Sequence, residues 1–188
     1  MYQGKRSYLP TSGTTFQKGV SMHYYGEVET EMDKLRIAYS PDGITMIALA
    51  EGTGAAFEKA YRKLFGTRPQ QGKVPARYKQ ALIKAAAGRD FDPVPIDLSG
   101  LSQFQLKVLK ELQKVPRGQV RTYLWLAGKV GRPLAARAVG NTMARNPVPF
   151  IIPCHRVVPT SGGIGNFGLG KERKRALLRR EGVQVERL

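Results

Sequence analysis

The stretch "NPVPFIIPCHRVV", residues 146–158, contains the only cysteine of the chain, Cys154, which lies between Pro153 and His155. Buried free cysteines are common in proteins, and most of them take part in no reaction. An apolar strand, "FIIPC", that buries an inert thiol is therefore one interpretation. The other is a reactive nucleophile, because prolines restrict this backbone and one of only two histidines directly follows the thiol. The residues of the stretch support both interpretations equally.

A thiol at this position needs a neighbour to react. Its reference pKa of about 8.5 leaves only about 3% of it ionised at neutral pH, so a base or a cation must lie near it. His155 and Arg156 are candidates, although adjacency along the chain does not guarantee contact. Glu181 is another, since it lies near the end of a predicted helix at 171–182, where a carboxylate opposes the helix dipole. It is either an ordinary helix-end residue or one with a partner elsewhere, such as His155.

Charge separates the two halves of the chain. The 188 residues carry a formal net charge of +17. From residue 96 onward there are 17 Lys and Arg against five Asp and Glu, whereas residues 1–95 hold 14 against nine. Positive charge concentrated in one half favours a polyanionic partner such as nucleic acid, and a solvated basic surface is the alternative.

Composition excludes several classes of protein. A hydrophobic content of 41% and a mean hydropathy of −0.33 are typical of a soluble globular protein, and no apolar run is long enough for a membrane span. The N-terminus lacks the apolar core of a signal peptide. One cysteine allows no internal disulfide and indicates a reducing compartment, so we expect a cytoplasmic protein. One Cys and two His, without suitably spaced carboxylates, predict no metal site.

The N-terminal half alternates between strand and helix signals. Residues 1–21 show no periodicity and are expected to form a flexible extension. A hairpin turn with Asp42 and Gly43 at its tip joins two β-rich runs. Residues 89–100 are rich in Pro and Asp and indicate a linker, so residues 22–95 are expected to form an α/β domain. The predicted elements are strands at 24–30, 34–40 and 44–50, and helices at 54–66 and 76–88.

The C-terminal half, residues 96–188, is expected to form a second domain. Ser102 is suited to cap a helix at 103–115, and Thr122 to cap one at 123–131. Pro133 is expected in the first turn of a helix at 134–145. Two short helices behind a longer one resemble a helix-turn-helix, although many three-helix clusters share this spacing.

The helix predicted at 134–145 is rich in small residues: Ala135, Ala136, Ala138, Gly140 and Ala144. Gly costs about 1 kcal/mol relative to Ala inside a helix, so it needs an explanation. Close packing against another helix is one, and close approach to a nucleic-acid backbone is the other. In the second case the long side chain of Arg137 could enter a groove or fill the gap left by an extruded base. Further on, the glycine-rich residues 161–170 form either a plain surface loop or a flat pocket wall.

Taken in order, these stretches resemble one family. "RAVGN" at 137–141, "NPVPFIIPCHRVV" at 146–158, "SGGIGN" at 161–166 and "RALLRREG" at 175–182 are similar to the O6-alkylguanine-DNA alkyltransferases, also called methylated-DNA–protein-cysteine methyltransferases. The resemblance covers roughly residues 98–184. It implies a ribonuclease-H-like α/β domain followed by a winged helix-turn-helix-like domain. It also implies irreversible, stoichiometric transfer of an alkyl group from guanine O6 to the protein's own cysteine, without a cofactor.

The resemblance also implies a role for each site residue. Cys154 would accept the alkyl group, His155 would deprotonate it through a water, and Glu181 would orient the imidazole. Tyr123 would donate a hydrogen bond to the leaving guanine, and Asn146 would fix the turn that carries the thiol. The carbonyls of Cys154 and Val157 would read the exocyclic amine, and the amide of Gly168 would lie near O6. Phe167 would form a pocket wall.

The implied partner is duplex DNA that contains alkylated bases, bound through its minor groove by a monomer that flips the damaged nucleotide. Whether copies bind DNA cooperatively, and whether O4-alkylthymine is a substrate, stays open. Arg137 would replace the flipped nucleotide in the stack. The other expected DNA contacts are Thr122, Tyr123, Ala135, Ala136, Ala138 and Gly140.

Two positions depart from the family pattern. Phe167 stands where Tyr is usual, and Leu169 stands where Gly is usual, so Leu169 is expected at the pocket mouth, where it would restrict larger adducts. Three other functions compete with alkyl transfer. The alkyltransferase-like sensors lack the reactive cysteine, a plain winged-helix regulator needs no Cys-His-Glu set, and no oxyanion hole marks a Cys-His hydrolase.

Overall fold

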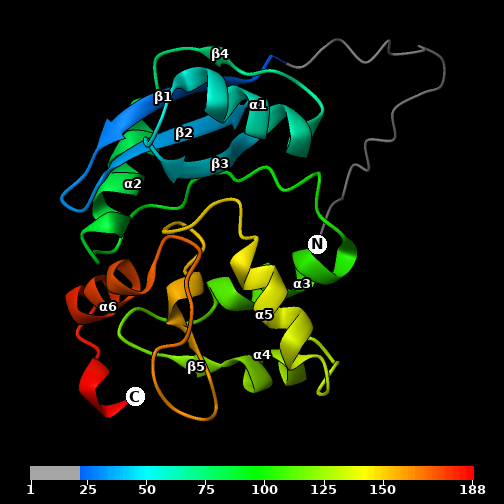
Figure 1. The fold of residues 1–188 in the computed structure, drawn as a ribbon, viewed down its shortest axis with the longest axis vertical. Helices are drawn as coiled ribbons and strands as arrows, with labels where there is room; N and C mark the ends of the chain where they lie inside the picture. Colours follow the sequence, from blue (N-terminus) through cyan, green and yellow to red (C-terminus); the bar gives the residue numbers. More distant parts are fainter. Residues whose placement is uncertain (1–21) are drawn as a thin grey trace, which may run out of the picture.

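A four-stranded sheet with two helices makes up the first half of the protein, residues 22–95 (Figure 1). The computed structural model describes residues 22–188, so the flexible extension expected at 1–21 lies outside the described residues. The strands are ordered β3-β2-β1-β4, with β1–β3 antiparallel and β4 parallel to β1. Their bounds are β1 Tyr24–Glu29, β2 Lys34–Ser40, β3 Gly43–Leu49 and β4 Gln70–Gln71.

The hairpin between β2 and β3 turns one residue earlier than predicted. Its tip is Pro41 and Asp42, and Gly43 is already the first residue of β3. Gly43 has a φ of +147°, and a Cβ on it would lie 2.5 Å from the carbonyl carbon of Pro95. The linker therefore approaches so closely that only glycine fits here. It stays beside β3 through hydrogen bonds from the Ile44 amide to the Pro95 carbonyl, 3.0 Å, and from the Asp97 amide to the Ile44 carbonyl, 2.9 Å.

Two helices cover opposite faces of this sheet. Helix α1, Gly54–Phe65, is capped by Thr53, whose side chain accepts a hydrogen bond from the Ala56 amide, and ends at Gly66, whose φ of 73° is left-handed. Its buried aromatic side chains pack on the face that contains Tyr25 and Ala38. Helix α2, Ala76–Ala86, packs on the other face, which it shares with the second half of the protein (Figure 1).

The second half, residues 96–188, is mainly helical. Helix α3, Gln103–Gln113, has a complete capping box between Ser102 and Gln105. Thr122 caps α4 by accepting a hydrogen bond from the Trp125 amide. Helices α3, α4 and α5 contact one another, as the helix-turn-helix prediction requires. The remaining elements are α4 Tyr123–Lys129, α5 Ala136–Ala144, α6 Lys171–Arg180, β5 Arg121–Thr122, β6 Val157–Val158 and the 3-10 turns Cys154–Arg156 and Val185–Arg187.

The prediction that Pro133 opens a helix is wrong. Helix α5 begins at Ala136, and Pro133 instead lies in a tight turn that the hydrogen bond from the Ala135 amide to the Arg132 carbonyl closes, 2.8 Å. The fixed φ of proline suits the second position of such a turn as well as it suits the first turn of a helix. The residue type alone therefore could not distinguish the two.

One buried cluster joins the two halves. It contains side chains of the sheet and α2, such as Ile37 and Leu82, together with Leu109 of α3 and Phe150 near the cysteine. The domain boundary expected between residues 95 and 96 stays a prediction. Across residues 22–188, none of the helices combines the length and the apolar character that crossing a membrane requires.

Candidate active site

Cys154 is presented by a tight turn, so the interpretation of "FIIPC" as a strand is wrong. Phe150 has a left-handed φ of 70°, and the chain turns there before the 3-10 turn that starts at Cys154. The Cys154 amide donates to the Ile152 carbonyl at 2.8 Å. The residue is only 4% exposed. Burial raises the pKa of the Cys154 thiol, so it is neutral until a base removes its proton.

The side chain of Asn146 stabilises this turn through three hydrogen bonds. Its side-chain amide nitrogen donates to the Ile152 carbonyl, 2.9 Å, and to the Sγ atom of Cys154, 3.0 Å. Its side-chain oxygen accepts from the Val148 amide, 3.1 Å. The expected role of Asn146 as the residue that fixes the turn therefore has a geometric basis.

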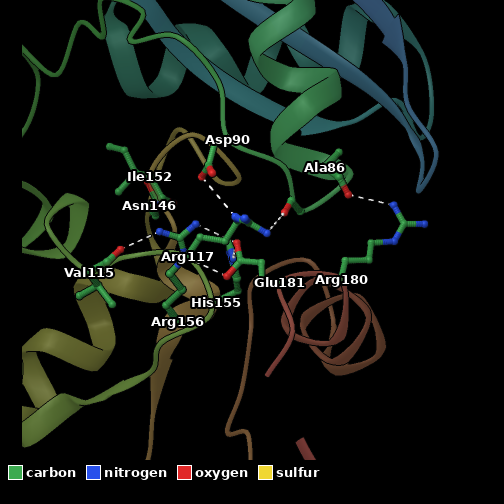
Figure 2. A network of polar contacts seen from close by, with 11 residues as sticks. Ala86, Asp90, Val115, Arg117, Asn146, Ile152, His155, Arg156, Arg180 and Glu181 are labelled. Carbon is green, nitrogen blue, oxygen red and sulfur yellow. Dashed lines mark hydrogen bonds and ion pairs between the residues drawn. The ribbon is translucent and has the colours of Figure 1, made fainter. Parts of the chain in front are cut away.

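Behind the cysteine, two consecutive residues share one carboxylate. The Nε2 atom of His155 lies 2.9 Å from Glu181 Oε1, and Arg156 donates to both oxygens of Glu181 at 2.9 and 2.8 Å. Arg156 also donates to the Val115 carbonyl at 2.7 Å (Figure 2). The sequence alone left open whether Glu181 has a partner, and the structure gives it two.

These contacts define the protonation of the site. Burial pushes the pKa of Glu181 upward, but hydrogen bonds from His155 and Arg156 outweigh it and lower the pKa to about 2. Burial also lowers the pKa of His155, so the ring is neutral. An ionised carboxylate only accepts, so Nε2 must carry the imidazole proton. Nδ1 then has a free lone pair, and within residues 22–188 it is buried without a hydrogen-bond partner.

Lys174 is a site residue that the sequence reasoning missed. It is fully buried, and its Nζ atom donates to the Val157 carbonyl, 2.6 Å, and to the Asn166 carbonyl, 3.3 Å. Burial lowers its pKa to about 8, and its charge opposes the effect of burial on the Cys154 thiol. Its spacing of three and four residues from the apolar Leu177 and Leu178 would have placed it on the buried face of α6.

A cavity of about 140 Å³ opens beside the thiol. It is smaller than a typical pocket for a drug-sized ligand, which suits a single flat group. Two expected residues, Val157 and Leu169, do not line it. Val157 is fully buried and Leu169 packs against the core, so the expected role of Leu169 at the pocket mouth lacks this contact. The lining residues are Tyr123, Gly140, Met143, Ala144, Cys154, Asn166, Phe167 and Gly168.

Helix α5 contributes one wall of the cavity, through Gly140, Met143 and Ala144. Gly140 lines the cavity, and a Cβ built on it would meet no atom of the described chain within 4 Å outside its own helix. Helix packing therefore does not explain this glycine. Arg137 and Ala138 are exposed, whereas Ala135 and Ala136 are partly exposed near the start of α5. Thr122 and Tyr123 lie at the start of α4, which contacts α5. The expected DNA contacts are therefore divided between two adjacent helices.

The fold and this site define a class of protein. It is a helix-turn-helix protein with a buried thiol, directly followed by a histidine that is paired with a carboxylate. Comparisons with known proteins agree with this class. A family model described as "6-O-methylguanine DNA methyltransferase, DNA binding domain" matches residues 103–183. The constitutive methylated-DNA–protein-cysteine methyltransferase of Bacillus subtilis is 32% identical over 168 residues, covering 89% of this chain and 97% of that protein. The chain belongs to the methylated-DNA–protein-cysteine methyltransferase family.

Solved structures agree with this assignment over both halves. The O6-methylguanine methyltransferase of Mycobacterium tuberculosis matches with a TM-score of 0.71 and 33% identity, over 85% of this chain and 93% of that one. The M. tuberculosis protein in complex with DNA matches with a TM-score of 0.68 and 32% identity over the same shares. A methyltransferase of the archaeon Pyrococcus kodakaraensis matches with a TM-score of 0.65 and 29% identity, over 86% of this chain and all of that one.

Proposed function

We propose that this protein repairs alkylated DNA by transferring the alkyl group from O6 of guanine to Cys154, once per molecule. The observation that carries the proposal is a buried thiol in the wall of a small cavity, followed directly in the chain by His155, whose ring is paired with Glu181. The names of its relatives in B. subtilis and M. tuberculosis support the same activity. The basic second half and the solved complex of the M. tuberculosis protein with DNA support duplex DNA as the partner.

The reaction proceeds as a displacement at carbon. The thiol proton of Cys154 passes to Nδ1 of His155 through a bridging water, as the family resemblance implies. The thiolate then attacks the alkyl carbon, so that a carbon–sulfur bond forms as the bond from carbon to O6 breaks. Guanine leaves with the electron pair, and the Tyr123 hydroxyl at the cavity wall stabilises it by donating a hydrogen bond. A thioether has no route back to the thiol, so the protein is consumed.

Two surrounding cations have different tasks in this proposal. The buried ammonium of Lys174 stabilises the thiolate when it forms, because its charge lowers the pKa of Cys154. The side chain of Arg137 lies outside the cavity on the exposed side of α5. From there its guanidinium fills the gap that the flipped nucleotide leaves in the base stack of the DNA.

The first test is the mass of the protein after reaction. Incubation with a duplex containing O6-methylguanine should add one methyl group, and peptide mapping should place it on Cys154. An unmethylated duplex of the same sequence is the control and should leave the mass unchanged. If the methylated duplex binds but the mass stays constant, the protein is a sensor of alkylated DNA rather than a transferase.

Arg137→Ala should slow transfer from duplex DNA by about tenfold, because flipping a base costs a few kcal/mol and the Arg137 side chain offsets part of that cost by filling the gap in the base stack. Transfer from free O6-methylguanine base needs no flipping and should stay within about twofold of the wild type. Single-turnover rates with both substrates measure this difference. Arg132→Ala, at an exposed residue in the turn before α5, is the matched control. An equal loss on both substrates would remove Arg137 from the flipping step.

A further inference from the structure

Arg173, near the start of α6, holds together two segments that are far apart in the sequence. Its Nε and Nη2 atoms donate to the two carboxylate oxygens of Asp33, each at 2.7 Å. Its Nη1 atom donates to the carbonyl of Leu169 at 3.0 Å. The Asp33 side chain is only 17% exposed and that of Arg173 33%. A single guanidinium therefore connects the first half of the protein to the loop that precedes α6.

Asp33 is a fixed anchor for this guanidinium. It ends the turn between β1 and β2, where the amide of Thr30 donates to the Asp33 carbonyl, 3.1 Å. The Thr30 hydroxyl donates to the same carbonyl, 2.7 Å, and accepts from the amides of Met32 and Asp33. A turn closed by its own hydrogen bonds presents the carboxylate in one position, so little entropy remains to be lost when Arg173 binds.

The segment at the other end of Arg173 forms part of the cavity wall. Phe167 and Gly168 line the cavity beside the thiol, and Leu169 follows them directly. Glycines make this loop costly to order, because glycine loses more backbone freedom than any other residue. Two other contacts hold it: Lys174 at the Asn166 carbonyl and the Gly170 amide at the Phe167 carbonyl. The bond from Arg173 is the one that reaches the first half of the protein.

We propose that Asp33 is a positioning residue for alkyl transfer: it fixes Arg173, and Arg173 fixes the loop 166–169 against the cavity that receives the alkylated base. This inference rests on the proposed function and extends it to the first half of the protein. The carboxylate of Asp33 touches no substrate. It acts by reducing the motion of the wall formed by Phe167 and Gly168.

Other contacts between the halves provide matched controls, since they do not reach this loop. Arg180 donates to the Ala86 carbonyl at 2.9 Å, and Arg117 donates to Asp90 at 3.2 Å (Figure 2). Arg180 also lies 3.5 Å from Glu31. Glu31 also pairs with Arg89 at 3.0 Å. Glu31→Gln therefore weakens the contact between the halves without touching the loop, whereas Asp33→Asn weakens both.

The experiment compares Asp33→Asn with Glu31→Gln in the full chain. Single-turnover transfer from a methylated duplex should slow about fivefold with Asp33→Asn and less than twofold with Glu31→Gln, because charge-assisted hydrogen bonds lose about half of their strength when one partner becomes neutral. Hydrogen exchange of residues 165–170 should increase only with Asp33→Asn. Affinity for unmethylated duplex should stay equal, which separates positioning from DNA binding. Equal rates and equal exchange in the two variants would overturn the proposal.

A second experiment exchanges the charges of the ion pair between Asp33 and Arg173. The double variant Asp33→Arg with Arg173→Asp can restore the ion pair between the halves, but aspartate at position 173 cannot donate to the Leu169 carbonyl. Thermal stability should recover toward the wild type while the transfer rate stays low. Full recovery of the rate would show that only the pairing of the halves matters and would reject the link to the loop. A wild-type chain that transfers no alkyl group would contradict the proposed function alone, because loop exchange would still test the role of Asp33.

Discussion

Glu181→Gln should slow alkyl transfer by about 100-fold, which is the largest effect expected from a side chain that does not touch the alkyl group. A glutamine amide can donate to Nε2 as well as accept from it, so it no longer fixes the proton of His155 there, and a base held in the wrong tautomer loses orders of magnitude in rate. The Glu181 side chain is 2% exposed, so the substitution also leaves Arg156 without its counter-charge. Single-turnover rates with methylated duplex measure the effect. Cys154→Ala, which lacks the acceptor thiol, gives the background rate of the assay.

The same substitution should lower the free energy of unfolding by about 3 kcal/mol at neutral pH. The pKa of Glu181 is about 2 in the folded protein against an ordinary value of 4.5, so its contribution is complete above pH 4.5 and is lost as the pH falls toward 2. Urea unfolding should therefore show a steeper loss of stability with acid in the wild type than in Glu181→Gln. Glu172→Gln, at an exposed carboxylate in the first turn of α6, is the control. An unchanged rate and an unchanged acid profile would contradict both roles of Glu181.

Lys174→Met should slow transfer by about 30-fold. One pKa unit on the thiol changes the thiolate fraction tenfold, and the loss of the hydrogen bond to the Val157 carbonyl frees the backbone beside the site. Lys174→Gln keeps a donor but no charge, so it should lie between the wild type and Lys174→Met. If Lys174→Gln reacts as fast as the wild type, the charge of Lys174 has no part in forming the thiolate.

The pH dependence of stability offers a second measurement on Lys174. Its pKa falls on folding from 10.5 to about 8, so between these values the unfolded chain binds more protons than the folded one. The buried charge opposes folding below pH 8, and the contribution of this group to stability rises from pH 8 to 10.5. Lys174→Met should lack that rise when unfolding is compared at pH 7.5 and pH 10.

Features that depend on neighbouring residues could be predicted from the sequence. The caps at Ser102 and Thr122 are correct because capping needs only a side-chain oxygen and amides two or three residues further on. Pro133 shows the limit of this reasoning, since two local structures accept the same φ. The turn at Phe150 could not be predicted, because a left-handed φ at a bulky residue is imposed by the surrounding packing.

The features that could not be predicted from the sequence depend on contacts between residues far apart in the chain. The family resemblance supplied the roles of Cys154, His155 and Glu181, and the structure brings the last two to 2.9 Å. No pattern in the sequence joins Arg173 to Asp33, which are 140 positions apart. The cavity lining also differed from expectation, since the side chain of Leu169 packs on the core while its carbonyl makes the contact with Arg173.

The linker has a consequence for how molecules of this protein behave toward one another. An exposed sheet edge presents unpaired amides and carbonyls that can recruit a strand from another molecule. Here the outer edge of β3 is occupied by the linker at Ile44, and the Ile47 amide donates to the Pro147 carbonyl at 2.8 Å. The opposite edge is the two-residue strand β4. The segment that connects the halves thus also protects the sheet from edge-to-edge aggregation.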